Sequence, residues 1–178
     1  MNIYVIRHGQ VSSNKERIIA SYTEVDLDET GIEQAMQASR LLKEIDYDTI
    51  YCSPQKRTMT TMKILNKDKK PVIFDERLKE RNAGKLEGKS ALEIDLDSYW
   101  NYYNEDIYEN AESMMSLFQR VYEFLEYLKK QSHLQNVVIV THDGVCRTIA
   151  CYFRGIPKDG NIRVYKHKNC EIRKYELK

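Results

Sequence analysis

The sequence lacks the segments that direct a chain into a membrane or out of the cell. No apolar run approaches the length of a membrane-spanning helix. A strand pattern begins at Asn2 without a charged segment, a long apolar stretch or a small-residue cleavage site, so we expect no signal peptide. Neither charge sign dominates, because 28 Lys and Arg face 27 Asp and Glu. We therefore expect a cytoplasmic protein that binds neither membrane nor nucleic acid, and any basic site must be local.

Cysteine is scarce and scattered along the chain. The four cysteines show no C-x-x-C spacing and stand at Cys52, Cys146, Cys151 and Cys170. This spacing argues against a zinc site and is typical of reduced thiols in the cytoplasm. We expect the four side chains to be small buried residues.

Repeats, low-complexity tracts and Pro- or Gly-rich linkers are also missing from the chain. Its 178 residues are enough to bury one substantial core. We therefore expect a single domain that spans residues 1–178, and nothing in the sequence indicates an oligomeric state.

Short runs rich in Val, Ile and Tyr alternate with segments of helical periodicity, which predicts a three-layer α/β/α sandwich with a mostly parallel central sheet. The expected helices cover about residues 30–45, a segment after Pro54, and about residues 111–131. Apolar residues recur every three or four positions in the longest helix, which indicates a core stripe or a partner-binding face. The expected strands are residues 2–6, 48–52, 71–74, 136–141, 162–167 and 170–176, the last two forming an edge hairpin.

Charged and imidazole side chains follow three of the expected strands. The first strand ends in Arg7 and His8, which resist burial unless something pairs with them, and strand 136–141 runs into His142. The proline after strand 48–52 suits the first helical position, which places Arg57 in the first helical turn. Each residue alone is more often structural or exposed. Because ligands of open α/β sheets bind beyond the carboxyl ends of the strands, these groups together predict an anion site.

Five motifs follow one another along the chain: RHGQVSSN, LDETGIEQA, CSPQKRTMTT, ERLKERNAGKLEG and VTHDG. The first resembles RHG-E/Q-T-x-x-N, and the last resembles a second-histidine motif. The three between them are similar to L-T-x-x-G-x-x-Q-A, S-x-x-x-R-[TA]-x-x-T and L-x-E-x-x-x-G-x-x-E-G. All five patterns belong to the histidine phosphatase superfamily, in its phosphoglycerate mutase-like branch. The resemblance implies a phosphoglycerate mutase-like fold over the whole chain.

The resemblance implies a role for each matched residue. His8 is the nucleophile, the phosphoryl group is held by Arg7, Arg57 and His142, and Glu80 protonates the leaving oxygen. The chemistry favours the same residue types, because a neutral imidazole attacks phosphorus without a separate base. Arginines suit the charge on the transferring phosphoryl oxygens. Since these groups supply the positive charge, we expect no metal and no cofactor. The alternative for Glu80 is a charged, solvated turn in FDERLKER.

Six further residues are candidates for substrate binding: Gln10, Asn14, Ser21, Tyr22, Tyr99 and Tyr103. Asn14 suits a phosphate contact, and equally suits a turn or helix N-cap. Ser21 stands in a loop, RIIASYTEVDLDETG, where relatives usually carry glycine, so the substrate orientation differs from theirs. The tyrosine-rich segment 98–110 predicts a pocket wall or a helix on the domain edge. Our hypothesis is a substrate-facing cap at about residues 89–110.

The resemblance implies a metal-independent phosphomonoesterase of the histidine acid phosphatase type, acting on a small phosphorylated metabolite through phosphohistidine at His8. The alternatives are a 2,3-bisphosphoglycerate-dependent phosphoglycerate mutase and a phosphoprotein phosphatase. The short interval from Glu80 to His142 leaves little room for the residues with which mutases enclose a bisphosphate. This interval favours the phosphatase, whose partner is a small phosphate ester.

Overall fold

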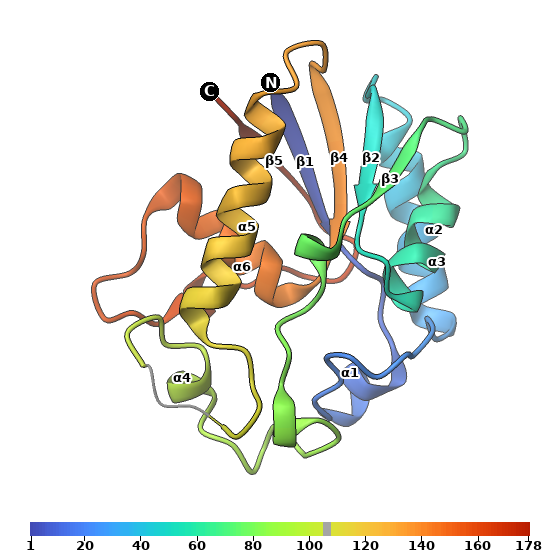
Figure 1. Ribbon diagram of the computed structural model, residues 1–178. Coiled ribbons are helices and arrows are strands. Elements are labelled where there is room, and N and C mark those ends of the chain that lie inside the picture. Colours follow the sequence, from blue (N-terminus) through green and yellow to red (C-terminus); the bar gives the residue numbers. More distant parts are fainter. Residues whose placement is uncertain (105–107) are drawn as a thin grey trace.

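A single sheet forms the centre of the computed structural model, which describes residues 1–104 and 108–178. In these two ranges, five strands pair in the order β3-β2-β4-β1-β5 (Figure 1). Strands β1 to β4 are parallel, so their carboxyl ends lie at one edge, and β5 runs antiparallel to β1. The strand bounds are β1 (Asn2–Arg7), β2 (Thr49–Cys52), β3 (Val72–Phe74), β4 (Asn136–Thr141) and β5 (Ile172–Glu176).

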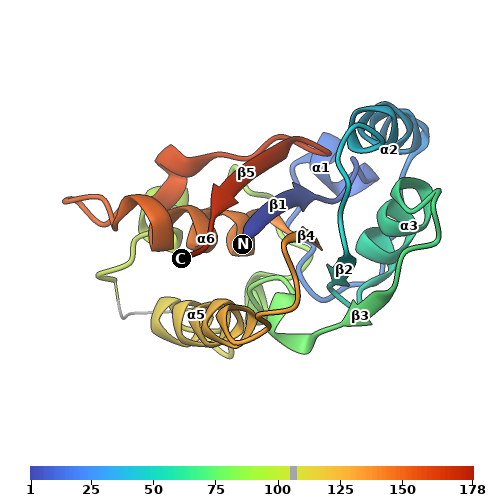
Figure 2. The same ribbon diagram turned by 90° about the horizontal axis from the view of Figure 1, so that it is seen from above.

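Helices cover both faces of the sheet (Figure 2). One face carries α5 (Met114–Lys129) and α6 (Asp143–Arg154), and the other carries α2 (Glu29–Leu42) and α3 (Lys56–Leu65). Alternate residues of the central strand β4 join these two cores. Val137 and Ile139 pack in the first core, and Val138 and Val140 in the second. The predicted α/β/α sandwich with a mostly parallel sheet is confirmed.

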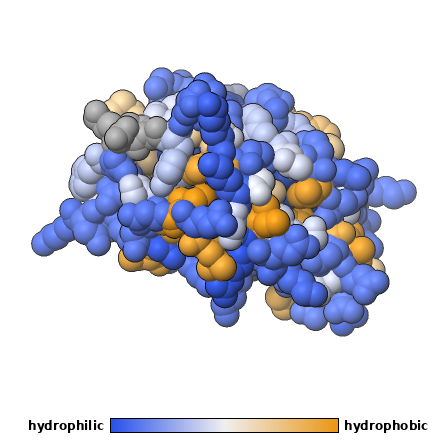
Figure 3. Space-filling model, turned by 90° about the horizontal axis from the view of Figure 1, so that it is seen from below, coloured by the Kyte–Doolittle hydropathy of each residue, from blue (hydrophilic) through white to orange (hydrophobic). Residues whose placement is uncertain are grey.

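Short elements gather beyond the carboxyl ends of the parallel strands. They include α1 (Ser12–Glu16) and α4 (Leu96–Tyr99), which lie below the sheet in Figure 1. The single-turn 3₁₀ helices are η1 (Glu76–Leu78), η2 (Gly84–Leu86) and η3 (Ile162–Tyr165). Viewed from this end, the surface is mostly hydrophilic, with small apolar patches (Figure 3). The expected cap at residues 89–110 falls here, although residues 105–107 of it lie outside the described residues.

The predicted strand at residues 162–167 is wrong, because this segment begins with the 3₁₀ helix η3. The Asn161 side chain accepts a hydrogen bond from the backbone N–H of Arg163 at 3.1 Å, which stabilises the first helical turn. Ile162 is fully buried and Val164 is 66% exposed. Residues two positions apart lie on the same face of a strand, so this difference in burial also argues against a strand here. The predicted edge hairpin is therefore wrong as well, and β5 alone pairs with β1 at this edge.

Helix boundaries also differ from those expected from the sequence. The helix expected at residues 30–45 ends at Leu42, and the one expected at residues 111–131 begins after its N-cap Ser113. Pro54 does not take the first helical position, because Gln55 is the N-cap of α3. Arg57 still lies in the first turn of α3, as predicted. Among residues 1–104 and 108–178, no helix has the length and apolar character needed to cross a membrane.

All four cysteines are buried and have free thiols. Burial raises the pKa of Cys52, Cys151 and Cys170 to about 12, and it also raises the pKa of Cys146 well above its usual value. The thiols are therefore protonated at neutral pH and make weak nucleophiles. The cysteines serve as small core residues.

Gly31, in the first turn of α2, packs directly on the backbone of the loop after β1. A Cβ atom at this position would lie 2.1 Å from the carbonyl oxygen of Gln10 and 2.8 Å from its nitrogen. Because both atoms belong to the backbone, only a shift of the loop or the helix relieves the clash. We expect Gly31→Ala to lower the free energy of unfolding by about 1–3 kcal/mol, measured by urea denaturation.

The control for this prediction is Gln37→Ala, at an exposed position of the same helix. It should change the free energy of unfolding by no more than about 0.5 kcal/mol. A Gly31→Ala protein as stable as the wild type would show that the close contact between α2 and the loop is not rigid.

Candidate active site

His8 directly follows β1 and is buried. Its Nδ1 lies 2.7 Å from the carbonyl oxygen of Gly9. Because a carbonyl oxygen only accepts hydrogen bonds, Nδ1 must carry the proton. Burial, and then the positive charges of Arg57 and Arg7, lower the pKa of His8 well below its usual value, so the ring is neutral. The remaining nitrogen, Nε2, therefore has the free electron pair that a nucleophile requires.

Arg57 is buried in the first turn of α3, where it is joined to His142. Its Nε–H donates to Nδ1 of His142 at 3.1 Å. Its terminal nitrogens donate to the carbonyl oxygens of Ser21 at 2.7 Å and Thr23 at 3.3 Å. Since Nδ1 of His142 accepts, its Nε2 carries the proton and donates to Oγ of Ser53 at 2.8 Å. Both ring nitrogens of His142 thus have protein partners, and the ring orients Arg57.

The two imidazole rings lie next to each other, with centroids 5.3 Å apart and planes tilted by 59°. The register of β1 and β4 explains this position. Arg7 is paired with Thr141, so His8 and His142 both stand one residue beyond the end of the ladder. Burial, followed by the charge of Arg57, lowers the pKa of His142 well below its usual value. The expected convergence of the two histidines at one sheet edge is what the structure shows.

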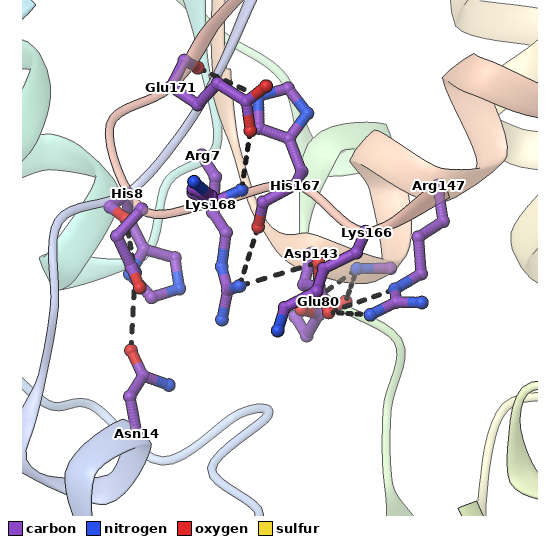
Figure 4. A network of polar contacts seen from close by, with 12 residues as sticks. Arg7, His8, Asn14, Glu80, Asp143, Arg147, Lys166, His167, Lys168 and Glu171 are labelled. Carbon is purple, nitrogen blue, oxygen red and sulfur yellow. Dashed lines mark hydrogen bonds and ion pairs between the residues drawn. The ribbon is translucent and has the colours of Figure 1, made fainter. Parts of the chain in front are cut away.

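Arg7 is the last residue of β1 and presents its guanidinium beside the His8 ring (Figure 4). Its Nη1 donates to the carbonyl oxygen of His167 at 2.9 Å and lies 3.5 Å from Oδ1 of Asp143. Its Nε is buried and has no hydrogen-bond partner in the described part of the chain. A buried donor without a partner is costly, so an oxyanion bound here would satisfy it.

Glu80 lies in the loop after η1, and its carboxyl group meets the N-terminus of α6. Its Oε1 accepts from the backbone N–H groups of Arg81 at 2.8 Å and Gly144 at 3.1 Å. A Cβ atom at position 144 would lie 2.4 Å from Oε1 of Glu80 and 2.9 Å from Trp100, so any residue larger than glycine would displace the Glu80 carboxyl group. Burial, assisted by the negative charge of Asp143, raises the pKa of Glu80. Glu80 is thus suited to hold a proton.

Asp143, the neighbouring carboxylate, has the opposite character. Burial opposes its ionisation, but ion pairs with Arg7 and Arg147 outweigh that effect and lower the pKa of Asp143. Arg147 lies one turn along α6 and donates to Oδ2 of Asp143 at 2.8 Å and 3.0 Å. The two carboxyl groups are therefore pushed in opposite directions, one toward a neutral acid and the other toward a fixed anion.

A cavity of about 630 Å³ opens at this end of the sheet. Of the residues predicted for the site, those that line it are Arg7, Gln10, Asn14, Ser21, Glu80 and Tyr99. His8, Arg57 and His142 are buried and do not line the cavity themselves. The lining residue Asn169 donates to the carbonyl oxygen of His8, and Arg57, which contacts His142, donates to the carbonyl oxygen of the lining residue Ser21. In residues 1–104 and 108–178, no cluster of three or more His, Cys, Asp or Glu is placed to hold a metal ion.

Two predicted substrate contacts lie outside the lining of this cavity. Tyr22 is 45% exposed, with its ring 5.5 Å from the Lys79 ammonium. Tyr103 is 61% exposed and packs edge-to-face against Tyr102. The geometry gives neither residue a place at the cavity. Aromatic and polar residues alternate around both tyrosines in the sequence. This pattern does not indicate which of the side chains face the cavity.

Gln10, Ser21 and Asn14 line the cavity and already have protein partners. The amide of Gln10 donates to Asp28 at 3.1 Å, and Oγ of Ser21 donates to Glu87 at 2.5 Å. Glu87 also accepts from the backbone N–H groups of residues 21–23, so it organises the loop that carries the acceptors for Arg57. Ser21 therefore contributes chiefly through its backbone.

Sequence reasoning missed the segment that runs from η3 to the start of β5. Its residues Arg163, Lys166 and Asn169 line the cavity. Nδ2 of Asn169 donates to the carbonyl oxygen of His8 at 2.8 Å and lies 3.4 Å from Oδ1 of Asn14. The signal was the polar run KHKNCE, which we interpreted as a hairpin turn instead of a loop that returns to the site.

Comparisons with known proteins agree with this geometry. The chain matches the family described as "Histidine phosphatase superfamily (branch 1)" over residues 3–178. It is 28% identical over 166 residues to the adenosylcobalamin/alpha-ribazole phosphatase of Escherichia coli, covering 89% of this chain and 82% of that protein. It is 33% identical over 157 residues to a metal-independent phosphoserine phosphatase of Arabidopsis thaliana, covering 83% and 66% of the two chains.

The fold of the chain also matches that of a solved phosphatase structure. The crystal structure of the alpha-ribazole phosphatase from Shigella flexneri superposes with a TM-score of 0.85 at 25% identity, covering 98% of this chain and 89% of that one. The matched family, the relatives and the fold confirm the resemblance seen in the five sequence motifs. The chain belongs to branch 1 of the histidine phosphatase superfamily.

Proposed function

We propose that the protein hydrolyses the phosphomonoester of a small metabolite through a phosphohistidine at His8. The observation that carries this proposal is the 2.7 Å hydrogen bond between Nδ1 of His8 and the Gly9 carbonyl. It leaves Nε2 unprotonated in a ring whose lowered pKa keeps it neutral. The names of the relatives support a phosphatase as the class of enzyme.

Two guanidinium groups provide the donors for the phosphoryl oxygens. Arg57 has five N–H groups, of which His142, Ser21 and Thr23 accept three, so one remains on each terminal nitrogen. Arg7 adds its unpartnered Nε–H. Donors already held in position stabilise charge that develops on the equatorial oxygens in the transition state. In this proposal His142 is a positioning residue that fixes the plane of Arg57.

Glu80 acts as the general acid and then as the general base. Its raised pKa favours the protonated form, which delivers a proton to the leaving alkoxide as the bond from phosphorus to that oxygen breaks. The resulting carboxylate then takes a proton from water as the water oxygen attacks phosphorus. This second step releases inorganic phosphate and restores neutral His8.

The segment from residue 89 onward forms the wall of the cavity opposite the histidines in this proposal. Its described residues that line the cavity are Ala91, Leu92, Leu96, Tyr99 and Trp100. Apolar side chains at this position favour contact with the organic part of the substrate and leave the phosphate to the cationic side.

We expect His8→Ala to lower kcat/KM by a factor of roughly 10⁴ or more, because no other described group replaces the nucleophile. The measurement is hydrolysis of a panel of metabolite phosphates with EDTA present. Rapid acid-free quenching and mass spectrometry of the wild type should find acid-labile phosphate on His8. The control is His133→Ala, an exposed histidine outside the site, which should keep full activity. Equal activity of His8→Ala and wild type would overturn the mechanism.

We expect Glu80→Gln to lower kcat/KM for an alkyl phosphate by about 10²–10⁴-fold and to have little effect on 4-nitrophenyl phosphate, whose leaving group needs no proton. The pH profile gives a second readout. Wild-type activity on the alkyl ester should fall as pH rises through the raised pKa of Glu80, because the acid form is lost. This alkaline limb should be missing from Glu80→Gln. Glu76→Gln, at an exposed position nearby, serves as the control and should retain the limb.

Leu92 tests the cavity wall, because it lines the cavity while 72% of its side chain is exposed. We expect Leu92→Ser to raise KM severalfold for esters of large apolar alcohols, because it removes about 1–2 kcal/mol of apolar contact. KM for glycerol 3-phosphate should stay unchanged. If the KM for each ester class were the same in Leu92→Ser as in the wild type, this wall would take no part in substrate binding.

A further inference from the structure

Gln55 is the N-cap of α3, yet its side chain does not cap the helix. The residue is buried, with 1% of its surface exposed, and its amide bonds to two loops of the site instead. Preferred N-cap residues use a shorter side chain to accept from the first free N–H groups of the helix. Helix capping therefore does not account for a buried amide at this position.

The Gln55 amide joins these two loops. Its Oε1 accepts from the backbone N–H of Glu80 at 3.0 Å, and its Nε2 donates to the carbonyl oxygen of Ser21 at 2.7 Å. These partners fix the orientation of the amide, because a backbone N–H only donates and a carbonyl oxygen only accepts. Among side chains of this length, glutamine alone combines a donor with an acceptor without carrying an ionisable group.

The carbonyl oxygen of Ser21 connects this bridge to Arg57. The same oxygen accepts from Nη2 of Arg57, also at 2.7 Å. One backbone atom thus binds both the guanidinium proposed to hold the phosphoryl group and the amide that holds Glu80. The bridge therefore sets the distance between the phosphoryl-binding group and the proposed general acid.

The loop that carries Glu80 depends on contacts of this kind. Residues 80–83 belong to no helix or strand, so no regular pattern of backbone hydrogen bonds fixes them. Arg120, from α5, donates to the carbonyl oxygens of Glu80 at 3.1 Å and Lys79 at 2.8 Å. With Gln55 on its N–H and Arg120 on its carbonyl oxygen, both backbone groups of Glu80 are held, which fixes the direction in which its side chain leaves the backbone.

We propose that Gln55 is a positioning residue for Glu80, and that its two hydrogen bonds set the place from which the Glu80 carboxyl group delivers a proton to the leaving oxygen. This inference rests on the proposed role of Glu80 and adds a residue to that mechanism. Gln55 does not line the cavity, so it acts through Glu80 and not by contact with the substrate.

Proton delivery is sensitive to position, because the acid must come within hydrogen-bond distance of the leaving oxygen. A misplacement of about 1 Å can lower a rate by about 100-fold. This cost applies only to esters whose leaving group needs a proton. Loss of the Gln55 bridge therefore predicts a substrate-selective defect, whereas a loss of folded protein lowers activity on every substrate by the same factor.

The test compares two esters in Gln55→Met, which removes both hydrogen bonds and nearly keeps the volume of the side chain. We expect kcat/KM to fall by about 10–100-fold for an alkyl phosphate and by less than about threefold for 4-nitrophenyl phosphate. An equal change on both esters, or no change on either, would overturn the positioning role.

Thr49→Val is the matched control, because it removes a different buried hydrogen bond at the start of β2. Oγ1 of Thr49 donates to the carbonyl oxygen of Pro71 at 3.0 Å, away from the carboxyl end of the sheet. This variant should change kcat/KM for both esters by the same factor. A selective loss on the alkyl ester in Thr49→Val would show that the defect does not report on Glu80, and would overturn the inference.

Gln55→Asn decides the question if Gln55→Met does not fold. It keeps a buried amide but shortens the side chain by one methylene, so the amide reaches at most one of its two partners. We expect the loss of kcat/KM on the alkyl ester to exceed the loss on 4-nitrophenyl phosphate by at least about threefold. Equal losses would overturn the proposal.

A double variant separates this inference from the proposed function. If Gln55 acts through Glu80, adding Gln55→Met to Glu80→Gln should lower kcat/KM for the alkyl ester less than about twofold further. An additional loss as large as that of Gln55→Met alone would overturn the positioning role and leave Glu80 as the acid. A Glu80→Gln protein that hydrolyses the alkyl ester as fast as the wild type would instead overturn the proposed acid itself.

Discussion

The parallel pairing of β1 with β4 is the constraint on which the rest of the site depends. Their register places His8 and His142 at equivalent positions beyond the ladder, with ring centroids 5.3 Å apart. Because β4 is buried on both faces, this register cannot slip without moving apolar residues out of two cores. The remaining groups of the site are arranged around this fixed pair.

Burial then decides what each group can do. Desolvation keeps the two histidines neutral, and it favours the protonated form of Glu80. The arginines stay charged, so the fold supplies them with acceptors: backbone carbonyls for Arg57, and the Asp143 carboxylate for Arg7. The site therefore contains neutral groups next to charged ones. Burial and neighbouring charges set the protonation state of each group.

The sequence alone was a good guide to the sheet and to the residues at its strand ends. Apolar runs of the right length predicted β1, β2 and β4 to within a residue or two, because central parallel strands are buried on both faces. The edge strand β3 was predicted as closely from its β-branched and aromatic residues, although two of its three residues are exposed. It failed at residues 162–167, where Ile162, Val164 and Tyr165 have the composition of a strand. So short a run fits a 3₁₀ turn equally well, and the Asn161 cap and the contact with α6 decide between them.

By itself, the sequence determined the strands, the family motifs and the types of side chain that meet at the carboxyl edge of the sheet. Local periodicity and side-chain chemistry can be read directly from the order of the residues. Only the tertiary structure decided which tautomers the histidines adopt and that His142 holds Arg57. Only it brought Asn169 and Lys166 to the cavity and left the exposed Tyr103 outside its lining. The orientation of Arg57 and the return of Asn169 depend on contacts between residues 85 and 161 positions apart in the chain. No local pattern encodes the direction in which a loop returns.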